Sequence, residues 1–341
     1  MTNMLINQGK KFFALIYNKH MNDKINNGII TAGSTYLGLC TYYNTSVPLL
    51  KISRKTLNNC IKINSTPQFT QFMYNAAGPI IQKNGLYDYG IRIADCSKSS
   101  GHCFIQKEIE NYEKSLNKRY DDKNNVLLNK FFNAIKKTKL KKFKRISQEV
   151  LDGKNAYYKK SKKVIVINMD KFSHALLHEL GHAINHKSLK NKEHLVYDIL
   201  KNEKRISRTL LTIMLISFFT NKKDNSEKQN KNPMYQIASF IKNNCGKLAF
   251  LVLLPKLAEE TIASIQGHKI SKKFIPPEYL NIIKKSHLRS FSSYAAYTLI
   301  TAFSVYLANQ ARDYTVMGAK KLIQFAKNKR TPKINNNKVN I

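Results

Sequence analysis

Four histidines spaced four residues apart form the part of this sequence best suited to metal chemistry. The run reads HALLHELGHAINH and extends from His174 to His186. In a helix, residues four apart lie within about 40° of each other on one face, so His178 and His182 can reach the same ion. Glu179 then lies about 100° round the helix, beside the ion, where its carboxylate can take a proton from a bound water.

The two outer histidines of the run are not expected to bind the same ion. The helical drift accumulated between His174 and His186 is roughly 120°, so all four rings cannot surround one metal. His174 is expected to be an ordinary polar position. His186 is expected to form a hydrogen bond to a ligand or to line the site without ligating the metal.

A catalytic zinc site needs a third protein ligand, and its position separates the classes of zinc protease. The extended pattern HExxHxxGxxH is excluded, because Asn185 and Ser188 stand where it requires Gly and His. The stretch LAEETIASIQGH, from Leu257 to His268, offers two adjacent glutamates instead. The sequence therefore predicts a third ligand on a second helix.

Glu260 is the favoured third ligand of the two glutamates. Small residues, Ala263 and Ser264, follow it by about one helical turn and let this helix pack closely on the histidine helix. Gly181, between the two central histidines, leaves room for the same approach. Glu259 points about 100° away from Glu260 and remains the competing ligand.

The segment before the histidines predicts the element that positions them. NAYYKKSKKVIVIN reads as two short strands joined by a polar turn, and the second strand, Val164 to Ile167, is a β-branched apolar run. Asp170 is a plausible N-cap for a helix through His186. The free edge of such a hairpin can hold an extended peptide by main-chain pairing. The apolar face of the predicted helix comprises Phe172, Ala175, Leu176, Leu180, Ala183 and Ile184.

HELGH followed, after a long apolar insertion, by Glu-x-x-Ala-Ser resembles the glutamate-zincins. The resemblance is to their membrane-bound families: the heat-shock membrane metalloproteases, the prenyl-protein (CAAX) proteases and small bacterial membrane zinc peptidases. It implies a zincin-like core that hydrolyses peptide bonds in protein substrates, with Zn²⁺ at His178, His182 and Glu260 and with Glu179 as general base. Ser264 departs from the aspartate of the larger families.

No residue can be matched to the group that stabilises the transition state in those families. His268 and several tyrosines are candidates for that role.

The pattern of the whole chain predicts a mostly helical α+β protein with the small β-hairpin before the histidine helix. Residues 104–152 show helical periodicity, whereas residues 51–104 read as loops and short strands. Three parts are expected: residues 1–150 with no assigned role, a metallopeptidase domain at residues 151–312, and a basic tail at residues 313–341.

One to three membrane or membrane-buried helices are also expected. Ser290–Ala311 has no charged residue and is the best spanning candidate, and Ile25–Leu50 is an uncharged but more polar stretch. Thr209–Thr220 and Leu248–Leu254 are shorter apolar runs.

Composition limits the classes of partner. The chain of 341 residues carries 58 Lys and Arg against 21 Asp and Glu, and the excess is spread along most of its length. This spread argues against a nucleic-acid-binding module and fits a solvated surface or attraction to an anionic membrane. The five cysteines have no metal-knuckle spacing and are expected to be thiols, and no secretory signal is evident. Oligomeric state is not indicated.

Two alternatives to a peptidase remain. One is a non-proteolytic zinc-binding protein of the same fold. The other is a basic protein of membrane surfaces or nucleic acids whose histidine motif is accidental.

Overall fold

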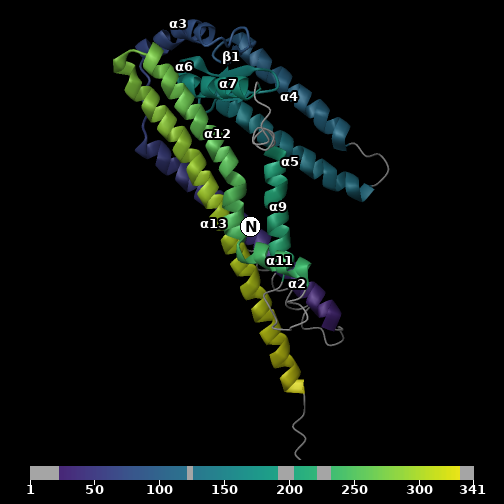
Figure 1. Ribbon diagram of the computed structural model, residues 1–341. Helices are drawn as coiled ribbons and strands as arrows, with labels where there is room; N and C mark the ends of the chain where they lie inside the picture. Colours follow the sequence, from purple (N-terminus) through teal and green to yellow (C-terminus); the bar gives the residue numbers. More distant parts are fainter. Residues whose placement is uncertain (1–22, 121–125, 191–202, 221–231, 331–341) are drawn as a thin grey trace, which may run out of the picture. The chain divides into compact units, whose positions relative to one another are not determined.

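The computed structural model describes residues 23–120, 126–190, 203–220 and 232–330, which are mostly helical (Figure 1). The long helices are α2 (Asp23–Cys60), α3 (Pro67–Lys83), α4 (Ser99–Tyr120), α5 (Val126–Leu151), α7 (Leu176–Lys190), α9 (Glu203–Phe219), α11 (Pro233–Asn243), α12 (Cys245–Phe274) and α13 (Pro277–Arg330). The strands are β1 (Arg92–Asp95), β2 (Tyr157–Lys159) and β3 (Val164–Ile167). The prediction of a mostly helical α+β fold is confirmed.

The chain folds into two compact units. The sheet unit comprises Arg54–Lys201 and Pro255–Ala295, and the helical unit comprises Met1–Ser53, Asn202–Leu254 and Ala296–Ile341. Helices α2, α12 and α13 contribute residues to both units. The two units are defined by which segments pack together. The predicted boundaries after residues 150 and 312 instead separate parts of the chain by their expected role, and that division stays a prediction.

The sheet has the strand order β1-β3-β2. The predicted hairpin is confirmed, because β2 pairs antiparallel with β3 and places Tyr158 opposite Ile165. Strand β1 pairs parallel with the other side of β3. β3 is therefore the central strand, and β2 forms one edge of the sheet.

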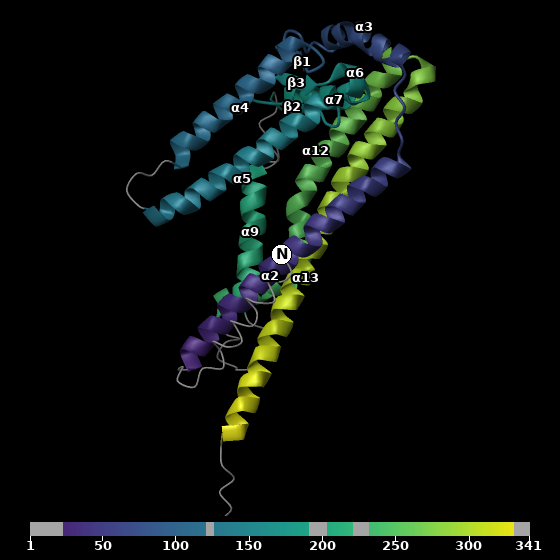
Figure 2. The same cartoon turned by 180° about the vertical axis from the view of Figure 1, so that it is seen from behind.

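Both faces of β3 are covered. Ile165 and Ile167 belong to the core that includes Leu176 and Leu180 of α7, whereas Val164 and Val166 pack with residues of α4 and α5. Figure 2 shows α4 and α5 side by side. These two helices account for most of residues 104–152, the stretch predicted to be helical. Alternate side chains of β3 point to opposite faces of the sheet, and those of Ile165 and Ile167 pack against α7 and fix its position.

The prediction of loops and short strands for residues 51–104 is partly wrong. This region contains β1 but also the end of α2 and all of α3. The hydroxyl oxygen of Thr66 accepts a hydrogen bond from the main-chain N–H of Phe69, and Pro67 occupies the first turn, as a helix start favours. Gly78 and Pro79 both lie within α3.

The histidine helix begins differently from the prediction. The N-cap is Asn168, whose side-chain oxygen accepts a hydrogen bond from the N–H of Lys171 at 3.1 Å, and not Asp170. A short helix, α6 (Met169–Phe172), and a single 3₁₀ turn then precede α7. Asn168 is favoured as the cap because its side-chain amide also donates a hydrogen bond to the carbonyl of Leu151. This bond joins the start of α6 to the end of α5.

The predicted membrane segments are not found. The best candidate, Ser290–Ala311, lies within α13, and the uncharged Ile25–Leu50 lies within α2. Among the helices in the described part of the chain, none is both long and apolar enough to cross a membrane. Interspersed Ser, Thr and Asn residues lower the mean hydropathy of these stretches. All five cysteines are free thiols, as predicted.

The helical unit encloses a group of charged side chains. The ammonium of Lys242, on α11, lies 2.6 Å from Oδ1 of Asp313 and 3.3 Å from the side-chain oxygen of Asn309, both on α13. The guanidinium of Arg312 lies 3.0 Å from the same Asp313 oxygen. Lys242 and Arg312 are buried. One carboxylate oxygen therefore contacts two buried cations.

Replacement of Asp313 by Asn is predicted to destabilise the protein by about 3–5 kcal/mol, because it leaves buried cations without their counter-charge. Urea unfolding measures this loss. Asp88→Asn, which removes the same charge from an exposed position in the sheet unit, is the control and is expected to change stability by less than about 0.5 kcal/mol. Equal stability of the two variants would contradict this account of the helical unit.

Candidate metal centre

Three predicted ligands come together between α7 and α12 in the sheet unit. His178 Nε2 and His182 Nε2 each lie 3.2 Å from Oε2 of Glu260, although Glu260 is 82 and 78 residues away from them in the chain. Their ligand atoms all lie within 4.8 Å of one another. His178 and Glu260 are buried and His182 is partly buried. This group can hold a metal ion.

The two helices meet at the smallest residues that they carry. A Cβ atom on Gly181 would lie 2.0 Å from the main-chain oxygen of Ala263, so only glycine permits this approach. A Cβ atom on Gly267 would similarly lie 2.5 Å from the carbonyl oxygen of Leu177. The main chains of α7 and α12 are thus nearly in contact at two points beside the ligand group. The predicted role of Gly181 and of the small residues after Glu260 is confirmed.

The two glutamates differ in their partners. Glu259 forms ion pairs with Lys160, in the turn after β2, and with Lys256 at 3.4 Å. Glu260 presents Oε2 to the histidines, and its Oε1 lies 3.0 Å from the ammonium of Lys256. The structure therefore places Glu260 in the ligand group and Glu259 outside it.

The carboxyl of Glu179 is buried beside the ligand group. The pKa of Glu179 is raised to about 7, because burial and the charge of Glu260 outweigh the opposing effects of His178, the main-chain N–H of Tyr158 and Lys256. The N–H of Tyr158 donates a hydrogen bond to this carboxylate. Because Tyr158 is in the edge strand β2, the acid lies next to the edge of the sheet.

Electrostatics also fix the protonation of Glu260. Burial acts to raise the pKa of Glu260, but hydrogen bonds from His178 and His182 and the charge of Lys256 outweigh it, so the pKa is lowered. The carboxylate is therefore ionised and able to act as a ligand.

Ser264 replaces the aspartate expected from the larger families and still contacts a ligand histidine. Its hydroxyl oxygen lies 3.2 Å from Nδ1 of His178. When Nε2 of His178 binds a metal, Nδ1 carries the proton and donates it to this hydroxyl. The serine thereby orients the ring from the side opposite the ligand group.

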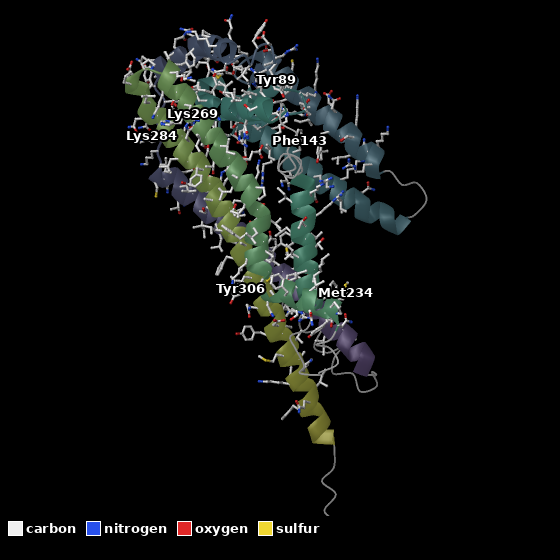
Figure 3. All side chains as sticks on the ribbon, viewed as in Figure 1. Tyr89, Phe143, Met234, Lys269, Lys284 and Tyr306 are labelled. Carbon is white, nitrogen blue, oxygen red and sulfur yellow. The ribbon has the colours of Figure 1, made fainter. Side chains whose placement is uncertain are left out.

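The outer histidines lie outside the ligand group, as predicted. His174 is buried with Nδ1 3.1 Å from the hydroxyl of Ser65, and burial and the charge of Arg289 lower its pKa to about 4. Nδ1 of His186 lies 3.3 Å from the hydroxyl of Tyr89, which Figure 3 labels, and 3.0 Å from that of Tyr158.

Three residues near the centre were not predicted. Lys256 contacts Glu260 from one turn earlier on α12, a spacing that the sequence could have revealed. Burial and the charge of Glu260 raise the pKa of Tyr294, on α13. The buried ring of His287 lies 6.1 Å from that of His178, and neither of its nitrogens has a hydrogen-bond partner among the described residues. No sequence signal links Tyr294 or His287 to the motif.

Comparisons with protein-family models, with curated proteins and with solved structures find no match to this chain.

Glu260→Gln is predicted to weaken metal binding by more than the roughly 10–100-fold that follows loss of an outer-shell partner, because it removes an anionic ligand. Glu259→Gln is the matched control, since it neutralises the adjacent carboxylate and is expected to leave affinity within about tenfold. Titration of the metal-free protein with Zn²⁺ and Co²⁺ measures both. Equal losses in the two variants would remove Glu260 from the centre.

Proposed function

We propose that this protein is a zinc-dependent metalloendopeptidase that hydrolyses peptide bonds in protein substrates. The observation that carries the proposal is the convergence of His178, His182 and Glu260 beside the buried carboxyl of Glu179. Two imidazole nitrogens and one carboxylate oxygen are the ligand set of a catalytic zinc with an open position.

The distances within the group support zinc as the ion. Zn²⁺ takes His and carboxylate ligands at about 2.0–2.1 Å in tetrahedral geometry, which places neighbouring ligand atoms about 3.3 Å apart. Each histidine Nε2 lies 3.2 Å from Glu260 Oε2, close to that value. The two separations that involve Glu260 therefore match those expected around a zinc ion.

The residues around the ion divide the chemistry among them. A zinc ion held by His178, His182 and Glu260 would supply a Lewis acid that acidifies a water and polarises the scissile carbonyl. Glu179 would take a proton from the attacking water and pass it to the leaving amine. Its burial favours the transfer, because a carboxyl with a pKa of about 7 can both accept and donate a proton near neutral pH.

The edge strand β2 is the proposed docking site for substrate. The main chain of Tyr158 lies beside Glu179, and within the described residues β2 has a sheet partner on one side only, β3. An extended peptide that pairs with this edge would bring its main chain next to the acid. Recognition through main-chain pairing suits an endopeptidase, because it does not depend on the ends of the substrate.

Glu179→Gln is predicted to abolish peptide hydrolysis, with at least a roughly 10²–10⁴-fold fall in kcat from loss of the general base, and to leave zinc content at the wild-type level. Cleavage of unstructured proteins and elemental analysis measure the two properties. Activity that survives in this variant would refute the mechanism. Wild-type protein that binds zinc and cleaves nothing would favour the non-proteolytic alternative.

We also propose that the helical unit contacts lipid. Along residues 296–309 of α13 the exposed large side chains are Tyr297, Leu299, Phe303 and Tyr306, whereas the buried positions include Thr298, Thr301, Ser304 and Asn309. A water-exposed helix normally shows the opposite distribution. Figure 3 labels Tyr306 and Met234, which are 47% and 75% exposed.

Further features of the helical unit support lipid as the partner. Large apolar side chains are also exposed on α9, at Leu211, Leu215 and Phe219. Apolar surface of this extent marks an interaction site. Exposed basic residues, Arg208 on α9 and Lys320 on α13, complement anionic headgroups. The exposed apolar side chains are spread over several helices, whereas a protein partner would more often cover a single patch.

The double variant Leu299→Asn/Phe303→Asn is predicted to lower binding to phosphatidylserine-containing vesicles at least about tenfold, because it removes apolar contact area worth about 25 cal/mol per Å². Flotation measures binding, and residual apolar binding is expected to persist in 1 M salt, where the screening length is about 3 Å. Leu288→Asn/Phe291→Asn, on exposed positions of the same helix in the sheet unit, is the control. Equal binding by both variants would contradict the proposal.

A further inference from the structure

Helix α5 carries a strongly basic surface that the proposed chemistry does not use. The helix contains eight basic residues and one acid, Glu149. Glu149 is partly buried and pairs with Arg145 of the same helix at 3.8 Å. Lys137, Lys141 and Lys144 are exposed, and no carboxylate of the described residues forms an ion pair with them. Their charge therefore faces solvent without a partner carboxylate from this part of the chain.

These three residues form one row along α5, the lysine row. At 100° per residue, Lys141 lies about 40° and Lys144 about 20° from the direction of Lys137, and the row is about 10 Å long. The opposite side of the helix packs on the protein. Phe143, which Figure 3 labels, contacts Tyr112 of α4 with ring centres 4.6 Å apart. The packing of α5 on α4 thus turns the lysine row outward.

The lysine row belongs to the same compact unit as the edge strand β2. Val150 and Leu151, at the end of α5, pack with Tyr157 of β2 in one apolar cluster. The row lies about 10–21 Å before Leu151 along the helix axis. Because an extended chain covers about 3.3 Å per residue, about three to six residues of a peptide at the edge of β2 span that distance. One substrate chain can therefore reach both the strand and the row.

The character of this surface selects among anionic partners. Along residues 133–151 of α5, no large apolar or aromatic side chain is exposed. The helix therefore offers no apolar face for insertion into a bilayer and no aromatic platform on which nucleic-acid bases stack. An acidic polypeptide segment needs only the charge, and it can be part of the chain that pairs with β2. The surface thus fits an acidic polypeptide best.

We propose that the lysine row is a docking site for acidic segments of protein substrates, a few residues from the bond that is cleaved. Main-chain pairing with β2 accepts many extended sequences, and the row supplies a selectivity that this pairing lacks. The inference rests on the proposed peptidase function and names its substrate class, proteins that carry a run of Asp and Glu. Attraction by the row acts on encounter and binding and not on the chemical step.

Peptides that share one cleavage region test the inference. Each carries a tract of Glu, Ser or Lys about three to six residues from the cleaved bond. For wild-type protein at low salt, we expect KM for the Glu peptide to be at least about threefold below that for the Ser peptide, with equal kcat, because exposed ion pairs are individually weak and act on binding. The difference is expected to vanish in 1 M salt, where the screening length is about 3 Å.

The variant Lys137→Glu/Lys141→Glu/Lys144→Glu reverses the charge of the row. It is expected to have a lower KM for the Lys peptide than for the Glu peptide, with kcat at the wild-type value. Such an inversion also shows that the variant is folded and active.

The matched control makes the same change of charge elsewhere in the sheet unit. It is Lys272→Glu/Lys273→Glu/Lys284→Glu, at exposed positions of α12 and α13, and Figure 3 labels Lys284. The control is expected to keep the wild-type preference for the Glu peptide. An equal loss of preference in both variants would overturn the inference, because it would assign the preference to the overall charge of the protein.

Other results that would overturn the inference are distinguishable from failure of the peptidase function. Equal KM values for the Glu and Ser peptides in the wild type would remove the docking role and leave the peptidase intact. A row variant that binds phosphatidylserine vesicles or duplex DNA more weakly, but a fluorescent Glu peptide as well as wild type, would replace the acidic substrate by lipid or nucleic acid. Wild-type protein that binds the fluorescent Glu peptide but cleaves none of the peptides would refute the peptidase function, and with it the substrate role of the row.

Discussion

The candidate metal-binding group depends on how closely α7 and α12 approach each other. The main-chain oxygen of Ala263 lies where a side chain on Gly181 would begin, so the separation of the helices is set by backbone contact. At that separation the carboxylate of Glu260 reaches both His178 and His182. A larger residue at either helix would move the third ligand away from the other two, since well-packed interiors do not yield by fractions of an ångström without cost.

The sheet holds the remaining parts of the site against this helix pair. β3 is buried on both faces, and its hairpin partner β2 is tied to the surrounding helices by ion pairs: Lys159 and Lys162 contact the buried Glu108, and Lys160 contacts Glu259. Glu259 thus serves as the anchor of the hairpin on α12. The same anchor keeps the main chain of Tyr158 beside the proposed general base, so the strand that would bind substrate and the acid that would act on it are held together.

Much of this arrangement could be predicted because the signals are local. The spacing of His178 and His182 is a property of one helix. The β-branched run from Val164 to Ile167 favours a strand by itself, and the small residue Ala263 indicates a close contact between helices. The identity of the third ligand was open because Glu259 and Glu260 are adjacent, and only the distant Lys160 separates them. Likewise, the cap at Asn168, the helix through Gly78 and Pro79, and the approach of Tyr294 and His287 depend on partners far along the chain. The prediction of spanning helices was wrong for a different reason. Polar residues are interspersed along the apolar stretches, so their mean hydropathy is too low for a membrane span.

Zinc-edge X-ray absorption on the purified protein, with metal content measured in parallel, tests the central claim most directly. The account predicts one zinc per chain and a first shell of nitrogen and oxygen atoms at about 2.0–2.1 Å, with the outer-shell scattering of two imidazoles. A shell that contains sulfur at about 2.3 Å, or a protein that holds no zinc, would contradict it.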